Sequence, residues 1–151
     1  MTICILDTTV VTNIIPVPGR DQQRDTVIAD LEKYLKQSVV LILPMAAIIE
    51  TGNHIGQSRG DGQHRRKTGE RFVDFVRKAI VGESPFIATP FVAPEDMLNW
   101  LNDFPDWSMR GTGFGDLSIK REFDRQCRLN PSRRVFIWSF DKHLAAYERA
   151  T

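Results

Sequence analysis

The sequence has few cysteines, no long apolar run and no excess of charge of one sign. Two cysteines among 151 residues exclude a disulfide framework, and neither has neighbours at the spacing of a zinc site. No apolar run approaches the roughly 18 residues of a membrane-spanning helix, so we expect a cytoplasmic protein without membrane contact. The formal net charge of +1 excludes attraction of the whole molecule to nucleic acid.

Length and composition indicate one globular domain. Hydrophobic residues make up 42% of the chain and charged residues 26%, which excludes a disordered or collagen-like polypeptide. A chain of this length buries enough surface to fold without disulfides or a structural metal. We therefore expect a single domain over residues 1–151, in which any metal would serve function.

Short apolar runs alternate with helical patterns. Residues 2–6, 39–43 and 134–140 are typical of buried strands, and residues 86–91 are a weaker candidate. Helical spacing predicts helices over residues 8–13, 26–36, 45–55, 72–80, 94–102, 117–127 and 142–148. Residues 103–115, with Pro105 and three glycines, are predicted to form a loop. This order predicts an α/β fold of three layers, with helices on both faces of a mainly parallel sheet.

Four acidic residues occupy comparable positions. Asp7 and Asp141 follow predicted strands, Glu50 lies on a helix opposite its apolar stripe, and Asp116 follows the glycine-rich loop at a predicted helix N-cap. Because strand ends meet at one edge of an α/β sheet, we expect these carboxylates in one crevice. Their repulsion would be relieved by Mg²⁺ or Mn²⁺, which prefer oxygen ligands. Taken singly, each aspartate fits a plain N-cap, and Glu50 fits a solvated helix face.

Four segments, in order, resemble those of the PIN-domain ribonucleases, a family that includes the VapC-like toxins of toxin–antitoxin pairs. The segments are ILDTTVV at 5–11, PMAAIIE at 44–50, GDLSI at 115–119 and IWSFD at 137–141. The resemblance implies a PIN-like fold and a metal-dependent endoribonuclease whose products carry a 5′-phosphate and a 3′-hydroxyl. It also implies a second copy of the chain and an antitoxin as partners.

The resemblance further implies roles for particular side chains. Mg²⁺ or Mn²⁺ would be held by the four carboxylates, and hydroxyl groups would orient those carboxylates or the attacking water. The residues concerned are Asp7, Glu50, Asp116 and Asp141 for the metal, and Thr8, Thr9 and Ser139 for the hydroxyls.

Two basic segments are candidates for RNA binding. Residues 59–78 carry seven Lys and Arg against three acidic residues, and residues 120–134 carry six against two. Such patches bind phosphates without reading base sequence, although both segments also fit solvated helix faces. In the first segment we expect RNA contact from Arg65, Arg66 and Lys67.

Other assignments are weaker. His54 and His64 have no partners at zinc-like spacing and are interpreted as surface residues, while Trp100 and Trp107 fit loop anchors. A phosphate-binding-loop NTPase would need a glycine-lysine-Ser/Thr loop, which is missing. A haloacid-dehalogenase-like phosphatase would need an aspartate where Thr9 stands. The alternative function is a non-catalytic PIN-type scaffold that binds RNA or protein.

Overall fold

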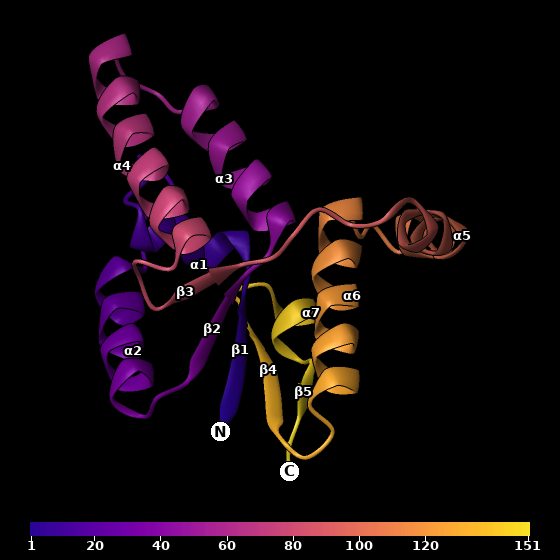
Figure 1. Cartoon of the computed structure of the whole chain (residues 1–151). Coiled ribbons are helices and arrows are strands. Elements are labelled where there is room, and N and C mark those ends of the chain that lie inside the picture. Colours follow the sequence, from indigo (N-terminus) through magenta and orange to yellow (C-terminus); the bar gives the residue numbers. More distant parts are fainter.

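A five-stranded sheet forms the centre of the molecule in the computed structural model, which describes residues 1–151 (Figure 1). The strands lie side by side in the order β3-β2-β1-β4-β5. Strands β1 to β4 run parallel, and β5 is antiparallel to β4. This arrangement confirms the predicted α/β class and its mainly parallel sheet. The strands are β1 (Thr2–Leu6), β2 (Val40–Leu43), β3 (Phe86–Ala88), β4 (Arg134–Trp138) and β5 (Glu148–Arg149).

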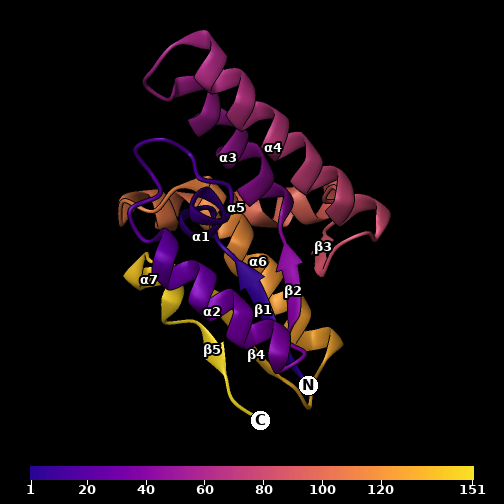
Figure 2. The ribbon, with the colours of Figure 1, turned by 90° about the vertical axis from the view of Figure 1, so that its left-hand side faces the viewer.

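Seven helices connect and cover the strands. In Figure 1, α2 lies to the left of the sheet and α6 to its right, and Figure 2 is viewed with α2 in front. None of the helices has both the length and the apolar composition that crossing a bilayer would require. The helices are α1 (Thr8–Ile14), α2 (Arg24–Lys36), α3 (Met45–Gln57), α4 (Gly62–Val81), α5 (Pro94–Met109), α6 (Phe114–Leu129) and α7 (Lys142–Ala145).

Alternate strand residues contribute to two separate cores. On one face, Leu6 and Trp138 pack with residues of α1 to α4. On the other face, Ile5 and Ile137 pack with residues of α6 and α7. A parallel sheet must be covered on both faces, which explains why its strands are continuous apolar runs rather than alternating patterns.

The carboxyl ends of the central strands lead directly into helices. Asp7 joins β1 to α1, Pro44 joins β2 to α3, and residues 139–141 join β4 to α7. The Asp7 backbone N–H donates to the Trp138 carbonyl at 3.0 Å, which holds the ends of β1 and β4 together. Acidic residues at these junctions therefore come together at one edge of the sheet.

Helix α5 differs from the prediction because it continues through Pro105 to Met109. Proline has no N–H to donate within the helix, yet the turns around it persist where α5 packs against the start of α6. The rings of Phe104 and Phe114 meet edge to face with centroids 5.2 Å apart. Only residues 110–113 of the predicted loop over residues 103–115 lie outside a helix, so the prediction was wrong for the rest.

Three further boundaries were also wrong. Helix α4 begins at Gly62, well before the predicted start at residue 72. Helix α6 has Gly113 at its N-cap, so Asp116 lies in the first helical turn instead of at the cap. The last predicted helix ends at Ala145, and β5 follows it as an antiparallel edge strand. Strand β5 is only two residues long, which is too short for a periodic pattern to reveal.

Candidate functional site

A polar pocket of about 310 Å³ at the carboxyl edge of the sheet brings the four predicted carboxylates together. Asp7 comes from the end of β1 and Glu50 from α3. Asp116 comes from the first turn of α6, and Asp141 from the N-cap of α7. Four segments far apart in the chain thus each contribute one acid, an arrangement that single helix caps do not require.

Asp7 is the most buried of these acids and the most completely hydrogen-bonded. Only 3% of its surface is exposed. Its Oδ2 accepts from the Ser139 hydroxyl at 2.7 Å and from the Thr9 hydroxyl at 2.8 Å. It also caps α1, accepting from the Thr9 backbone N–H. The N-cap interpretation is therefore correct for Asp7, although it does not account for the two hydroxyl groups that hold its carboxylate.

Ser139 connects two of the acids. Its hydroxyl donates to Asp7 and accepts from the Asp141 backbone N–H at 2.9 Å. Asp141 in turn caps the short helix α7 by accepting from the His143 N–H at 2.8 Å. The Phe140 N–H donates to the Thr9 hydroxyl at 3.0 Å. These bonds fix the loop after β4 against the start of α1.

Glu50 is held between a hydroxyl group and a glycine. The Thr8 hydroxyl donates to Glu50 Oε2 at 2.7 Å. On its other side, the Glu50 carboxylate lies so close to Gly115 that a Cβ at that position would overlap it. Steric constraint therefore explains the glycine of the GDLSI segment, since any larger residue at this position would displace Glu50.

Asp116 shows the electrostatic consequence of this crowding. Its pKa is raised from 3.8 to about 6, first by burial and then by the negative charges of Asp7, Asp141 and Glu50. The charge of His143 acts weakly in the opposite direction. The part of the shift that comes from these three acids reflects negative charge that the protein itself leaves uncompensated, as expected where a cation binds.

The donor set fits a hard divalent cation, although the carboxylates do not stand in coordinating positions. No group of three or more His, Cys, Asp or Glu side chains is close enough together to hold an ion directly. The pocket nevertheless offers carboxylate and hydroxyl oxygens and no thiolate, a set that suits Mg²⁺ or Mn²⁺. Binding would require side-chain rotation or waters between protein and ion.

Among the pocket residues that the sequence did not assign to it, two have basic side chains. Arg20, between α1 and α2, lines it, and so does His54, one helical turn after Glu50. Burial, and then the charge of Arg20, lower the pKa of His54. The spacing of four between Glu50 and His54 places both on one helix face and could have revealed His54. Nothing in the sequence pattern indicates Arg20.

The predicted RNA-binding residues lie apart from the carboxylates. Arg65, Arg66 and Lys67 belong to α4 and do not line the pocket. Arg65 donates to the Gly60 carbonyl at 2.6 Å, and Arg66 pairs with Glu70 at 3.2 Å. The Arg65 hydrogen bond stabilises the start of α4, and Arg66 and Glu70 form an exposed ion pair within the helix.

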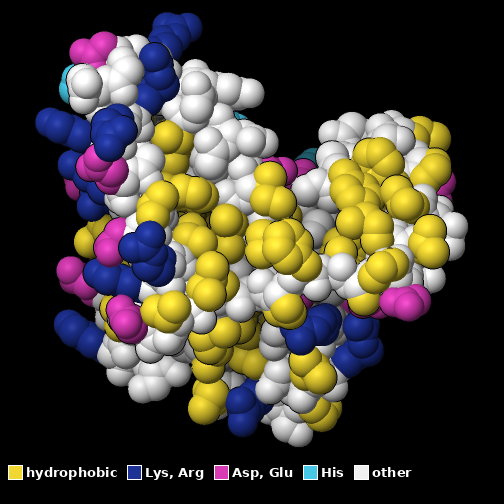
Figure 3. Space-filling model, turned by 45° about the horizontal axis from the view of Figure 1, so that its top comes forward, with side chains coloured by type: hydrophobic (Ala, Val, Ile, Leu, Met, Phe, Trp, Pro, Cys, Tyr) yellow, Lys and Arg dark blue, Asp and Glu magenta, His cyan; other side chains and the backbone are white.

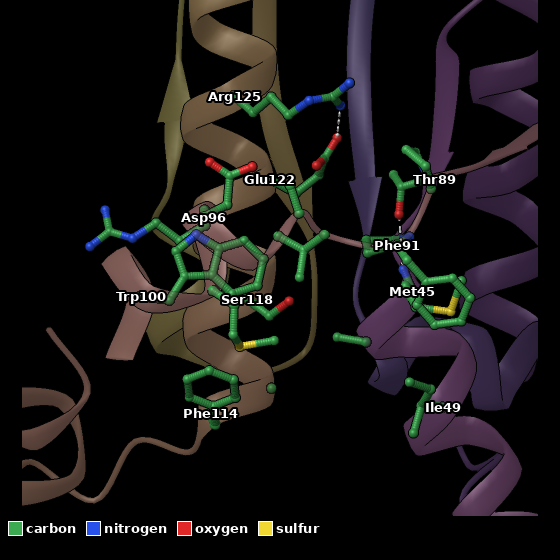
Figure 4. Close-up of a pocket in the computed structure, with 18 of the residues that line it drawn as sticks. Met45, Ile49, Thr89, Phe91, Asp96, Trp100, Phe114, Ser118, Glu122 and Arg125 are labelled. Carbon is green, nitrogen blue, oxygen red and sulfur yellow. Dashed lines mark hydrogen bonds and ion pairs between the residues drawn. The ribbon is translucent and has the colours of Figure 1, made fainter. Parts of the chain in front are cut away.

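A second, apolar pocket of about 520 Å³ adjoins the first and shares Glu50 with it. Figure 4 shows Trp100 and Phe114 on one side and Met45, Ile49 and Phe91 on the other. The space-filling view shows hydrophobic side chains gathered over α5 and the neighbouring hollow, while Lys and Arg lie over α4 (Figure 3). The second pocket thus offers the hydrophobic surface that the first lacks, beside acidic and basic side chains of α5 and α6.

Searches of family models, curated proteins and solved structures found no match for this chain.

Proposed function

We propose that this chain is a metal-dependent endoribonuclease that hydrolyses RNA phosphodiester bonds at the pocket of Asp7, Glu50, Asp116 and Asp141. One observation supports the proposal above the others: four carboxylates from four separate segments line one pocket, and their repulsion contributes to the raised pKa of Asp116. Such an arrangement is electrostatically costly for a structural site and is useful for a cation-dependent one.

The chain's own residues would position the carboxylates. When bound, Mg²⁺ or Mn²⁺ lowers the pKa of a water and neutralises charge that develops on the phosphate during in-line attack. Ser139 and Thr9 hold Asp7 by hydrogen bonds, and Thr8 holds Glu50. The reaction then needs no protein nucleophile.

Helix α4 would supply a further contact to the substrate. The guanidinium groups of Arg65 and Arg66 already have partners within the protein, whereas Lys67 is exposed and without an ion-pair partner. We propose Lys67 as the principal phosphate contact of this group. The toxin role, an antitoxin partner and self-association rest on the resemblance alone.

Cleavage of mixed cellular RNA tests the proposal. Purified protein should produce discrete cuts with Mn²⁺ or Mg²⁺ and none with EDTA. Asp116→Asn should reduce the rate by at least about a hundredfold, because it removes a carboxylate that would hold the metal ion. The matched control is Asp106→Asn on the exposed side of α5, outside the pocket, which should cleave like wild type.

The same proteins distinguish the alternative function. Mn²⁺ should raise the Tm of wild type and of Asp106→Asn, and should raise that of Asp116→Asn less, because a ligand of the native state stabilises it by mass action. RNA binding without cleavage and without a Mn²⁺-dependent Tm would favour the non-catalytic scaffold and contradict the nuclease.

A further inference from the structure

The segment between α1 and α2 fixes the backbone of Arg20 beside the carboxylate pocket. Ile15 and Val17 of this segment are buried and anchor it to the core. The Val17 N–H donates to the Thr12 carbonyl at 3.0 Å, and the Arg20 N–H donates to the Val17 carbonyl at 2.9 Å. Gly19 provides the turn, with a φ of +83° that favours glycine.

The second half of the segment is tied to α1 by side chains. Asn13 Oδ1 accepts from the Gln23 backbone N–H at 2.9 Å. The Arg24 guanidinium donates to the carbonyls of Asn13 and Ile14 at 2.6 and 2.7 Å. With both halves anchored, the loop holds the Arg20 side chain at the pocket rim without depending on any contact that Arg20 itself makes.

Arg20 is the only lysine or arginine that lines the pocket, and it is unpaired. None of the structure's ion pairs involves it. Its side chain makes no hydrogen bond in the structure and is exposed. The Arg24 guanidinium, in contrast, donates to two backbone carbonyls. A guanidinium that served to neutralise the acids would form an ion pair with one of them. Because Arg20 forms none, its guanidinium is available to a ligand.

The charge balance of the pocket indicates which kind of ligand Arg20 would bind. Four carboxylates repel a polyanion, so a phosphodiester chain that reaches them needs local positive charge in addition to a metal ion. A guanidinium presents paired N–H donors that match two phosphate oxygens. His54, whose pKa is lowered by burial and by Arg20, supplies little positive charge of its own at neutral pH.

From this geometry we infer that Arg20 binds a phosphate group of the RNA strand, one that neighbours the phosphate at the carboxylates. The inference rests on the proposed function for the identity of the strand. It assigns the pocket a substrate-binding side, formed by the loop between α1 and α2, that is separate from the basic residues of α4.

Salt-dependent RNA binding tests the inference. The full-length Asp116→Asn protein, in EDTA, is titrated against a labelled single-stranded oligoribonucleotide by fluorescence anisotropy over a series of KCl concentrations. Adding Arg20→Gln should weaken binding several-fold. It should also reduce the slope of log K against log salt by about 0.7, the value for one phosphate contact on a single strand. Arg20→Lys should restore the slope but only part of the affinity, because it keeps the charge and loses the paired donors.

Lys36→Gln is the matched control, since it removes one exposed positive charge at the end of α2, outside both basic segments and the pocket. Equal effects of Arg20→Gln and Lys36→Gln on the slope would overturn the inference, as would failure of the Asp116→Asn protein to bind RNA at the lowest salt.

Cleavage assays on protein that retains Asp116 distinguish failure of the inference from failure of the nuclease proposal. Cleavage that depends on Asp116, with a KM unaffected by Arg20→Gln, contradicts only the role of Arg20. Arg20-dependent binding without any cleavage keeps the phosphate site and contradicts the nuclease.

Discussion

Two adjoining pockets differ in almost every respect, although Glu50 lines both. The carboxylate pocket is formed at strand ends and the starts of helices, where hydroxyl groups hold acids in place. The apolar pocket is formed by α3, α5, α6 and residues 89–93, and its aromatic and aliphatic side chains stand beside charged side chains of α5 and α6. The first concentrates charge that a ligand must neutralise, whereas the second offers surface that water solvates poorly.

The boundary between the pockets runs through one turn of α6. Gly115 lines the apolar pocket and the next residue, Asp116, lines the polar one. Glu50, which lines both pockets, lies against Gly115. Its position therefore depends on the absence of a side chain at Gly115. The position of the carboxylate cluster therefore depends on packing at its apolar side as well as on its own hydrogen bonds.

The largest effect should come from displacing Glu50 with Gly115→Ala. The new methyl group would push the Glu50 carboxylate out of its present position. The fold should tolerate the change, since alanine favours a helix by up to about 1 kcal/mol and the clash involves the end of a flexible side chain. We expect Mn²⁺ affinity, measured from thermal shifts, to fall about tenfold to a hundredfold, with the metal-free Tm unchanged or higher.

Gly69→Ala within α4 is the control, because a Cβ there would meet nothing within 4 Å. It should raise stability by a similar amount and leave the response to Mn²⁺ unchanged. If Gly115→Ala retained the full response, the room that Gly115 leaves for the Glu50 carboxylate would not matter for metal binding.

The next effect concerns the hydroxyl network of the polar pocket. Ser139→Ala removes the donor to the buried Asp7 and the acceptor for the Asp141 N–H. We expect a loss of about 1–3 kcal/mol in the free energy of unfolding by urea, because hydrogen bonds to a buried charge are costly to lose. Ser108→Ala, which removes an exposed hydroxyl bonded to the Pro105 carbonyl, should cost less than about 0.5 kcal/mol. Similar losses in both variants would show that Ser139 does not support Asp7.

A smaller effect is expected from pH. Folded metal-free protein keeps the Asp116 proton up to about pH 6, whereas the unfolded chain loses it near the ordinary pKa of 3.8. Between these values the native state binds more protons, so the contribution of Asp116 to stability is lost as pH rises through this window. Above pH 6, in EDTA, Asp116→Asn should therefore be more stable than wild type. Urea unfolding of both proteins from pH 4 to 8 measures the difference.

Manganese should reverse that order at neutral pH, because only wild type retains the fourth carboxylate. A difference in stability that did not change between pH 4 and 6 would mean that Asp116 is not perturbed by its neighbours.

The sequence predicted the features that depend on local pattern. The apolar runs located β1, β2 and β4 because strands buried on both faces cannot alternate. The acids at the ends of β1 and β4 followed from those runs, and their convergence with Glu50 followed from the topology of parallel sheets. These inferences need no knowledge of side-chain packing.

Features set by tertiary contacts were not predictable. Pro105 suggested a loop, but the packing of α5 on α6 sustains the helix through it. Asp116 was predicted as a cap because aspartate favours caps, whereas Gly113 takes that position. Arg20 is fixed by anchors elsewhere in its loop, so no spacing relates it to the acids.

The smallest effect should come from the apolar pocket itself. Phe91→Ala removes a ring that is 78% exposed, so unfolding free energy should change by less than about 0.5 kcal/mol. Mn²⁺ affinity and RNA cleavage should not change, since Phe91 lines only the apolar pocket. Phe114→Ala, whose ring packs on Trp100 and Phe104, should by contrast lower the Tm measurably. A rise in KM for RNA with Phe91→Ala and an unchanged Tm would remove the distinction between the pockets, because the apolar one would then take part in substrate binding.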